Sequence, residues 1–104
     1  DIGITAFCVR VPIEYGHSLV LNMELEKNIE VEDIKYILSD KEGLLVHNEY
    51  VTPNEIINDE NVHVSRLKKD KDFNYSMFIT FNNLLRGASL NSIEIAESII
   101  NLSN

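Results

Sequence analysis

Two side chains near the start of the sequence could act together on a small molecule, namely Arg10 and His17. A guanidinium is permanently charged and presents a fork of N–H donors that fits a planar carboxylate. An imidazole titrates near neutrality, so it can accept a proton and return it in a reversible reaction. The pair therefore indicates a site that could bind a carboxylate and move a proton beside it.

The rest of the sequence lacks the common signatures of a metal or nucleotide site. One cysteine and three widely spaced histidines fit no usual zinc spacing, so we expect no metal. The four glycines form neither a phosphate loop nor a G-x-G-x-x-G fingerprint. The chain has 9 basic and 17 acidic side chains, and its net charge of 9 − 17 = −8 argues against nucleic-acid binding. No run approaches the roughly 18 to 20 apolar residues of a membrane helix, so we expect a soluble protein.

The two candidate residues lie in and after a predicted strand. Apolar and other residues alternate from Ile4 to Ile13, which predicts a strand that has Arg10 on the face opposite Val9. Turn residues follow, and alternation resumes over a second predicted strand, Ser18 to Glu26. We therefore expect Arg10 on a strand and His17 in the loop between two strands.

Five further elements are expected to position these residues. A helical period starts near Val31 and stops before Gly43, and a second amphipathic helix opens near Asn83 and runs on from Leu90. Three more strands are predicted, over residues 44–47, 62–68 and 75–81. Strands interspersed with two helices indicate an α+β fold, in which a mainly antiparallel or mixed sheet is covered on one face by both helices. We expect residues 1–104 to form a single domain.

Four ordered segments of the sequence resemble one enzyme family over essentially the whole chain. The segments are Cys8-Val9-Arg10-Val11-Pro12, Gly16-His17-Ser18, Val64-Ser65-Arg66-Leu67, and Asn83-Leu84 with Arg86-Gly87-Ala88-Ser89-Leu90-Asn91 and Ile95-Ala96-Glu97. Together they are similar to the C-terminal part of aspartate-semialdehyde dehydrogenases. Two positions depart from the family pattern: Leu85 stands where a basic residue is more common, and Glu94 where a glutamine is common.

The resemblance implies an NADP-dependent oxidoreductase that interconverts aspartyl phosphate and aspartate semialdehyde, on the way to lysine, threonine and methionine. It implies that His17 is the general acid/base, that Arg10 binds the substrate carboxylate and that Asn83 lies near the nicotinamide of the cofactor. Asparagine at the start of a helix is also a routine N-cap. The resemblance also implies a homodimer formed through the sheet.

The sequence starts inside a strand-like run without an initiator methionine, so we expect a piece of a longer chain. By the family pattern, the nucleotide-binding domain and the cysteine nucleophile precede this piece, and the piece alone is inactive. Cys8 is then a partly buried structural cysteine, and Arg66 is either an ion-pair partner inside the domain or a contact to substrate or a second subunit. A lone cysteine fits a reducing compartment, and we expect a cytoplasmic protein. The alternative is a non-catalytic relative that kept the fold and dimer surface as an interaction module.

Overall fold

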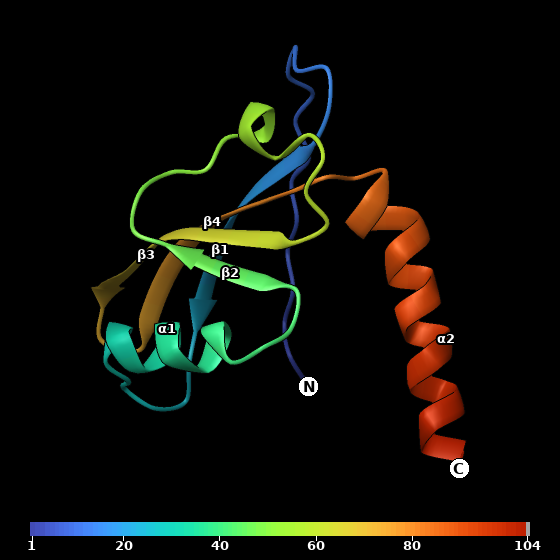
Figure 1. Ribbon diagram of the computed structural model, residues 1–104. Helices are drawn as coiled ribbons and strands as arrows, with labels where there is room; N and C mark the ends of the chain where they lie inside the picture. The colour runs from blue at the N-terminus through green and yellow to red at the C-terminus, as the bar shows by residue number, and fades with distance from the viewer. Residues whose placement is uncertain (104) are drawn as a thin grey trace.

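The computed structural model describes residues 1–103, which contain a four-stranded sheet, one helix packed on it and one helix beside it (Figure 1). The strands lie in the order β1 (His17–Glu24), β4 (Asn74–Phe81), β3 (Val62–Lys71) and β2 (Leu44–His47). β4 runs antiparallel to both of its neighbours, whereas β2 and β3 are parallel. The sheet is therefore mixed, as the sequence predicts.

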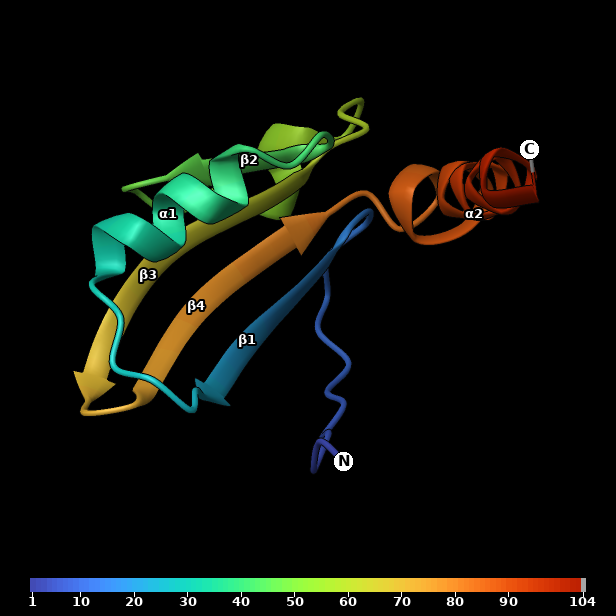
Figure 2. The same cartoon turned by 90° about the horizontal axis from the view of Figure 1, so that it is seen from below.

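The core lies between the sheet and helix α1 (Val31–Ser39), which crosses one face of the sheet (Figure 2). Ile34 is the buried residue of α1, and it packs with Val64, Met77 and Tyr75 from the two central strands. Tyr75 is fully buried, and its hydroxyl both donates to Ile29 O at 2.6 Å and accepts from Ile29 N–H at 2.7 Å. This residue therefore ties β4 to the connection between β1 and α1.

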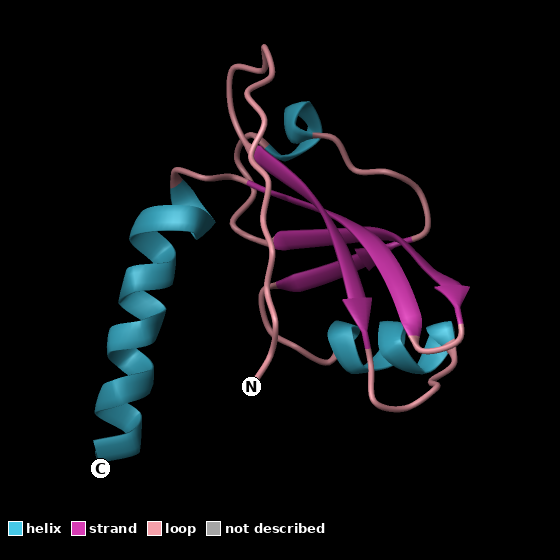
Figure 3. Cartoon of the chain, turned by 180° about the vertical axis from the view of Figure 1, so that it is seen from behind, coloured by secondary structure: helices cyan, strands magenta, loops and turns pink. Residues whose placement is uncertain are grey.

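The last helix projects away from the sheet. A π-helical turn, η2 (Leu85–Ser89), leads into α2 (Leu90–Ser103), and none of the described residues of α2 is buried (Figure 3). Ile93 and Ile99 are more than half exposed, at 55% and 59%. The expected α+β class is confirmed, and α1 is the helix that covers the sheet in this single chain.

The predicted strand over residues 4–13 is wrong. This segment is loop in the structure and exposed throughout, and Phe7 is 92% accessible (Figure 3). A strand is held by ladder hydrogen bonds to a neighbour, and within residues 1–103 no strand pairs with this segment. The other four predicted strands and both helices are present, with ends that differ by at most a few residues.

None of the helices in residues 1–103 is long and apolar enough to cross a membrane.

Candidate active site

His17 is the first residue of β1 and lies at the end of the sheet. It pairs with Phe81, the last residue of β4, and its imidazole meets the Phe81 ring edge-on, with 5.7 Å between centroids and 74° between planes. His17 is exposed, so its ring nitrogens can be reached by a small molecule. The strand end and the phenyl ring together give this imidazole a defined position at the surface.

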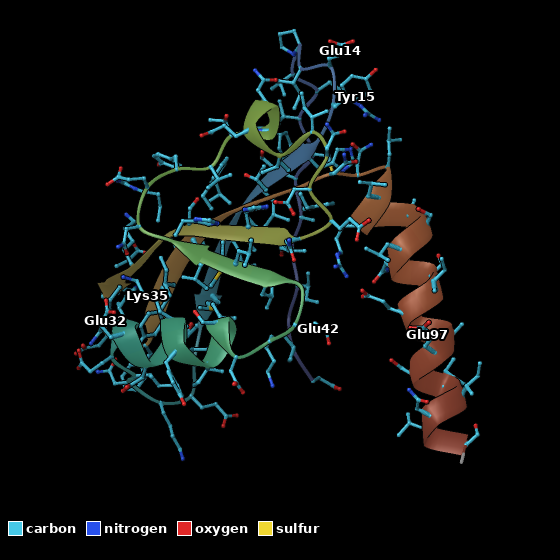
Figure 4. All side chains as sticks on the ribbon, in the orientation of Figure 1. Glu14, Tyr15, Glu32, Lys35, Glu42 and Glu97 are labelled. Atoms are coloured by element: carbon cyan, nitrogen blue, oxygen red, sulfur yellow. The ribbon has the colours of Figure 1, made fainter. Side chains whose placement is uncertain are left out.

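The residue before His17 turns the chain into the strand. Gly16 is buried and has a φ of +91°, a conformation that costs residues with a Cβ about 1–2 kcal/mol. A Cβ at this position would also lie 3.0 Å from Cβ of Pro53, the first residue of the 3-10 helix η1 (Pro53–Ile56). Glycine is therefore strongly favoured immediately before His17. Figure 4 shows Glu14 and Tyr15 at the tip of the loop that leads into this turn.

Asn83 holds this turn from the other end of the sequence. Its Oδ1 accepts a hydrogen bond from Gly16 N–H at 3.0 Å, across 67 positions of the chain. The structure therefore brings together two of the three predicted site residues, because His17 follows Gly16 directly.

Asn82, a residue that the sequence alone does not point to, holds the turn that leads into the final helical segment. Its Oδ1 accepts hydrogen bonds from Leu84 N–H at 2.9 Å and Leu85 N–H at 3.2 Å, and its Nδ2 donates to Ile57 O. Asn83 is not the N-cap of this segment, because η2 begins after Leu84. The two adjacent asparagines are visible in the sequence, but only the backbone geometry after β4 decides which N–H groups each of them meets.

Arg10 lies in the exposed N-terminal segment, and no salt bridge among the described residues holds its guanidinium. The structure therefore leaves Arg10 accessible, and its approach to His17 remains a prediction.

The structure corrects the expectation for Cys8 and contradicts one of the two alternatives for Arg66. Cys8 was expected to be partly buried, but it is exposed, because the segment that carries it has no strand partner in the described chain. Arg66 forms no ion pair within residues 1–103; its guanidinium carbon lies 4.8 Å from the centre of the Tyr50 ring, on which it stacks. A backbone φ of +55° at Arg66 accompanies a register shift between β3 and β4.

Glu94, one of the two departures from the family pattern, forms an ion pair with Arg86. The Arg86 Nη1 to Glu94 Oε2 distance is 2.6 Å, and Arg86 Nε donates to Glu60 O, also at 2.6 Å. This arginine therefore joins η2 and α2 to the loop before β3, next to the segment that carries Asn83.

A second cluster of titratable groups lies at β2 and β3. His47 Nε2 and His63 Nδ1 are 3.0 Å apart, and His63 Nε2 lies 3.2 Å from Asp59 Oδ2. The backbone N–H of Asn61, before all other causes, keeps the pKa of Asp59 below its ordinary value. Among residues 1–103, no group of three or more His, Cys, Asp or Glu side chains could hold a metal ion.

Comparison with known proteins agrees with the resemblance found in the sequence. Residues 1–86 match the family model described as semialdehyde dehydrogenase, dimerisation domain. Aspartate-semialdehyde dehydrogenase of Rickettsia conorii is 37% identical over 100 residues, which cover 89% of this chain and 30% of that protein. The Aquifex aeolicus enzyme of the same name is 36% identical over 107 residues, covering 96% of this chain and 32% of the relative.

Solved structures show the same fold. The structure of aspartate semialdehyde dehydrogenase from Francisella tularensis superimposes with a TM-score of 0.77 at 26% identity, covering 86% of this chain and 28% of that one. Aspartate semialdehyde dehydrogenase II from Vibrio cholerae, complexed with ASA, gives a TM-score of 0.80 at 24% identity, over 88% of this chain and 29% of that one. The chain thus spans less than a third of the length of each of these relatives.

Proposed function

The chain belongs to the semialdehyde dehydrogenase dimerisation-domain family, and from that premise we propose that it is the C-terminal part of an aspartate-semialdehyde dehydrogenase. The proposed reaction is the reversible reductive dephosphorylation of aspartyl phosphate to aspartate semialdehyde, in the cytoplasmic synthesis of lysine, threonine and methionine. A cysteine outside this chain would supply the thiolate that forms a thioester with the substrate. Residues 1–104 would then be inactive by themselves, because both that cysteine and the nucleotide-binding domain lie elsewhere.

In this proposal His17 exchanges a proton with the substrate oxygen. The imidazole is exposed, and it is held against Phe81 at the end of β1. A neutral imidazole can take the proton in one direction, and the imidazolium can give it back in the other. His17 would thereby serve both directions of a reversible reaction.

Arg10 would bind the carboxylate of the same small molecule. Its guanidinium offers two parallel N–H donors to a planar anion, which fixes both the position and the orientation of the substrate. Arg10 is exposed, so its guanidinium is available for that contact. Lysine would supply the charge without the fork, so it is expected to be a poor replacement.

The cofactor of the proposed enzyme is NADP, which would be bound mainly by the domain outside this chain. When bound, it supplies or accepts the hydride. Among the residues present, Asn83 could contact this cofactor. Its Oδ1 already accepts from Gly16 N–H, so its Nδ2 would donate to the carboxamide oxygen of the nicotinamide.

The observation that carries the proposal is the hydrogen bond from Gly16 N–H to Asn83 Oδ1. It unites the loop of the proposed acid/base with the loop of the proposed cofactor contact, although the two lie at opposite ends of the sequence. The enzyme is favoured over the non-catalytic interaction module because relatives at 36–37% identity carry the name of the enzyme.

The homodimer is proposed to form through the sheet face that α1 leaves uncovered. Val20 on β1 is 67% exposed there, and Tyr50, which packs edge-on against Phe78 of β4, is 56% exposed. Large apolar side chains grouped on one sheet face are typical of a surface that pairs with another copy. This agrees with the description of the matched family as a dimerisation domain.

The experiment for the enzyme proposal measures phosphate-dependent NADP reduction by the longer chain with aspartate semialdehyde. We expect H17Q to lower kcat by about 10²- to 10⁴-fold, because glutamine keeps much of the shape but cannot transfer the proton. R10K should mainly raise KM for the semialdehyde. Wild-type kinetics in both variants would refute the proposed site, whereas absence of turnover by the wild-type longer chain would favour the interaction module.

A further inference from the structure

The amide of Asn83 is arranged to hold the residue that precedes His17. Its Oδ1 accepts from Gly16 N–H at 3.0 Å, and since the partner is a backbone donor, the oxygen and nitrogen ends of this amide are identified by the contact. Gly16 is buried, so its N–H needs a protein partner to replace water. Without the Asn83 side chain this N–H would be buried and unpaired, and we expect the turn to rearrange so that the N–H finds another acceptor.

The Asn83 side chain extends from a backbone that is itself fixed. Asn82, 5% exposed, accepts from Leu84 N–H and Leu85 N–H and donates to Ile57 O. On the other side, Phe81 pairs with His17 in the β1–β4 ladder and contacts its ring. Phe81 and Asn82 therefore connect Asn83 to the end of a strand and to a hydrogen-bonded turn before η2.

The imidazole of His17 has two supports that differ in kind. Phe81 contacts one side of the ring, which limits its tilt, and also pairs with His17 in the β1–β4 ladder. The turn at Gly16, whose φ of +91° directs the chain into β1, positions the backbone from the other side of His17. A shift of about 1 Å at a group that transfers a proton can lower a rate by about 100-fold.

We propose that Asn83 is a positioning residue for His17, acting through its hydrogen bond to Gly16 N–H. This inference rests on the proposed role of His17 as the acid/base. It assigns Asn83 a function that is separate from any contact to the cofactor, because the two functions use opposite ends of one amide. Loss of the acceptor should therefore affect the proton-transfer step, whereas loss of the donor should not.

The test uses the longer enzyme, with variants that separate the two ends. N83A removes both the acceptor and the donor, and we expect it to lower the plateau kcat of the pH profile about tenfold while KM for the semialdehyde stays the same. N83D keeps an oxygen acceptor for Gly16 N–H but lacks the donor proposed for the nicotinamide, so it should raise KM for NADP while its plateau kcat at saturating NADP stays well above that of N83A. Equal loss of kcat in N83A and N83D would overturn the proposal.

The chain contains a matched control at the opposite end of the same strands. Asn28 Oδ1 accepts from Phe73 N–H at 2.8 Å, and Phe73 also has a positive φ, of +66°. N28A thus removes the same kind of bond to the same kind of turn, next to the end of β1 away from His17. We expect its kcat to equal that of wild type, and a loss as large as that of N83A would reduce Asn83 to a general structural role and overturn the proposal.

A double variant tests whether Asn83 acts through His17. In the H17Q background, N83A should change kcat by less than about twofold, because the group that it positions is already gone. A further tenfold loss in that background would overturn the inference while leaving the role of His17 intact. Wild-type turnover by H17Q alone would instead overturn the proposed acid/base role of His17. Hydrogen exchange at Gly16, faster in N83A but not in N83D, would still report on the bond itself.

Discussion

Replacing Gly16 with alanine should lower both the stability of the domain and the kcat of the longer enzyme, and the structure gives an expected size for each loss. The backbone at this position has a φ of +91°, which costs an L-residue with a Cβ about 1–2 kcal/mol. The new Cβ would also lie 3.0 Å from Pro53 Cβ and 3.5 Å from Phe81 O, so the turn or η1 must move by a few tenths of an ångström. Together these effects should lower the free energy of unfolding by about 1–3 kcal/mol.

That loss is small compared with the roughly 5–15 kcal/mol that stabilises a folded domain, so most molecules of G16A stay folded at 25 °C. The displaced backbone, however, belongs to the residue before His17. We therefore expect kcat of the longer enzyme to fall about tenfold or more at temperatures where the variant is still folded.

The assay pairs thermal unfolding of the residue 1–104 chain with turnover of the longer enzyme. A loss of 1–3 kcal/mol corresponds to a fall in Tm of about 4–15 °C for a chain of this size. G3A is the matched control, because nothing lies within 4 Å of a Cβ built at Gly3, and its Tm and kcat should not fall. Wild-type kcat in G16A, or an equal effect of G3A, would refute the reasoning.

Three further predictions concern the fold and its assembly. Y75F keeps the buried ring but leaves Ile29 N–H and C=O without their partner, so urea unfolding of the chain should show a loss of about 2 kcal/mol; an unchanged midpoint would contradict this. The folded pKa of Asp59 is lowered from its ordinary value of 3.8, chiefly by Asn61 N–H, so its stabilisation is present above pH 3.8 and disappears as the pH falls through the folded pKa. Between pH 5 and pH 2, the Tm of D59N should therefore fall less than that of wild type, and parallel curves would count against this role. V20E places a charge on the uncovered sheet face, where Val20 is 67% exposed, and should shift sedimentation toward the monomer; an unchanged dimer would place the interface elsewhere.

The sequence predicted well those elements whose partners lie within the chain. The alternation over residues 18–26 and 75–81 describes strands that pair with each other, and β1 and β4 do so from His17–Phe81 to Glu24–Asn74. The strand predicted from the same alternation over residues 4–13 is not formed. Alternation shows which side chains share a face, but it does not show which neighbouring strand supplies the hydrogen bonds of the ladder. Within residues 1–103 that partner is missing, and the segment with Arg10 is an exposed loop.

The candidate site was predictable in its residue types but not in its connections. A glycine before His17 and asparagines before the final helix are visible in the sequence, yet their meeting depends on the antiparallel register that sets His17 opposite Phe81. The contact between His47 and His63 has the same origin. Parallel pairing places Leu45 opposite His63 and His47 opposite Ser65, so the two rings are diagonal neighbours, a relation that their spacing in the sequence does not contain.

The most direct test of the proposed site is a crystal structure of the longer enzyme with bound aspartate semialdehyde or a stable analogue. We predict that the carboxylate of the ligand lies within bidentate hydrogen-bond distance of the Arg10 guanidinium. The same ligand's carbonyl oxygen, or the atom that replaces it, should lie within about 3.2 Å of a His17 ring nitrogen. A ligand bound with either side chain turned away from it would contradict the assignment.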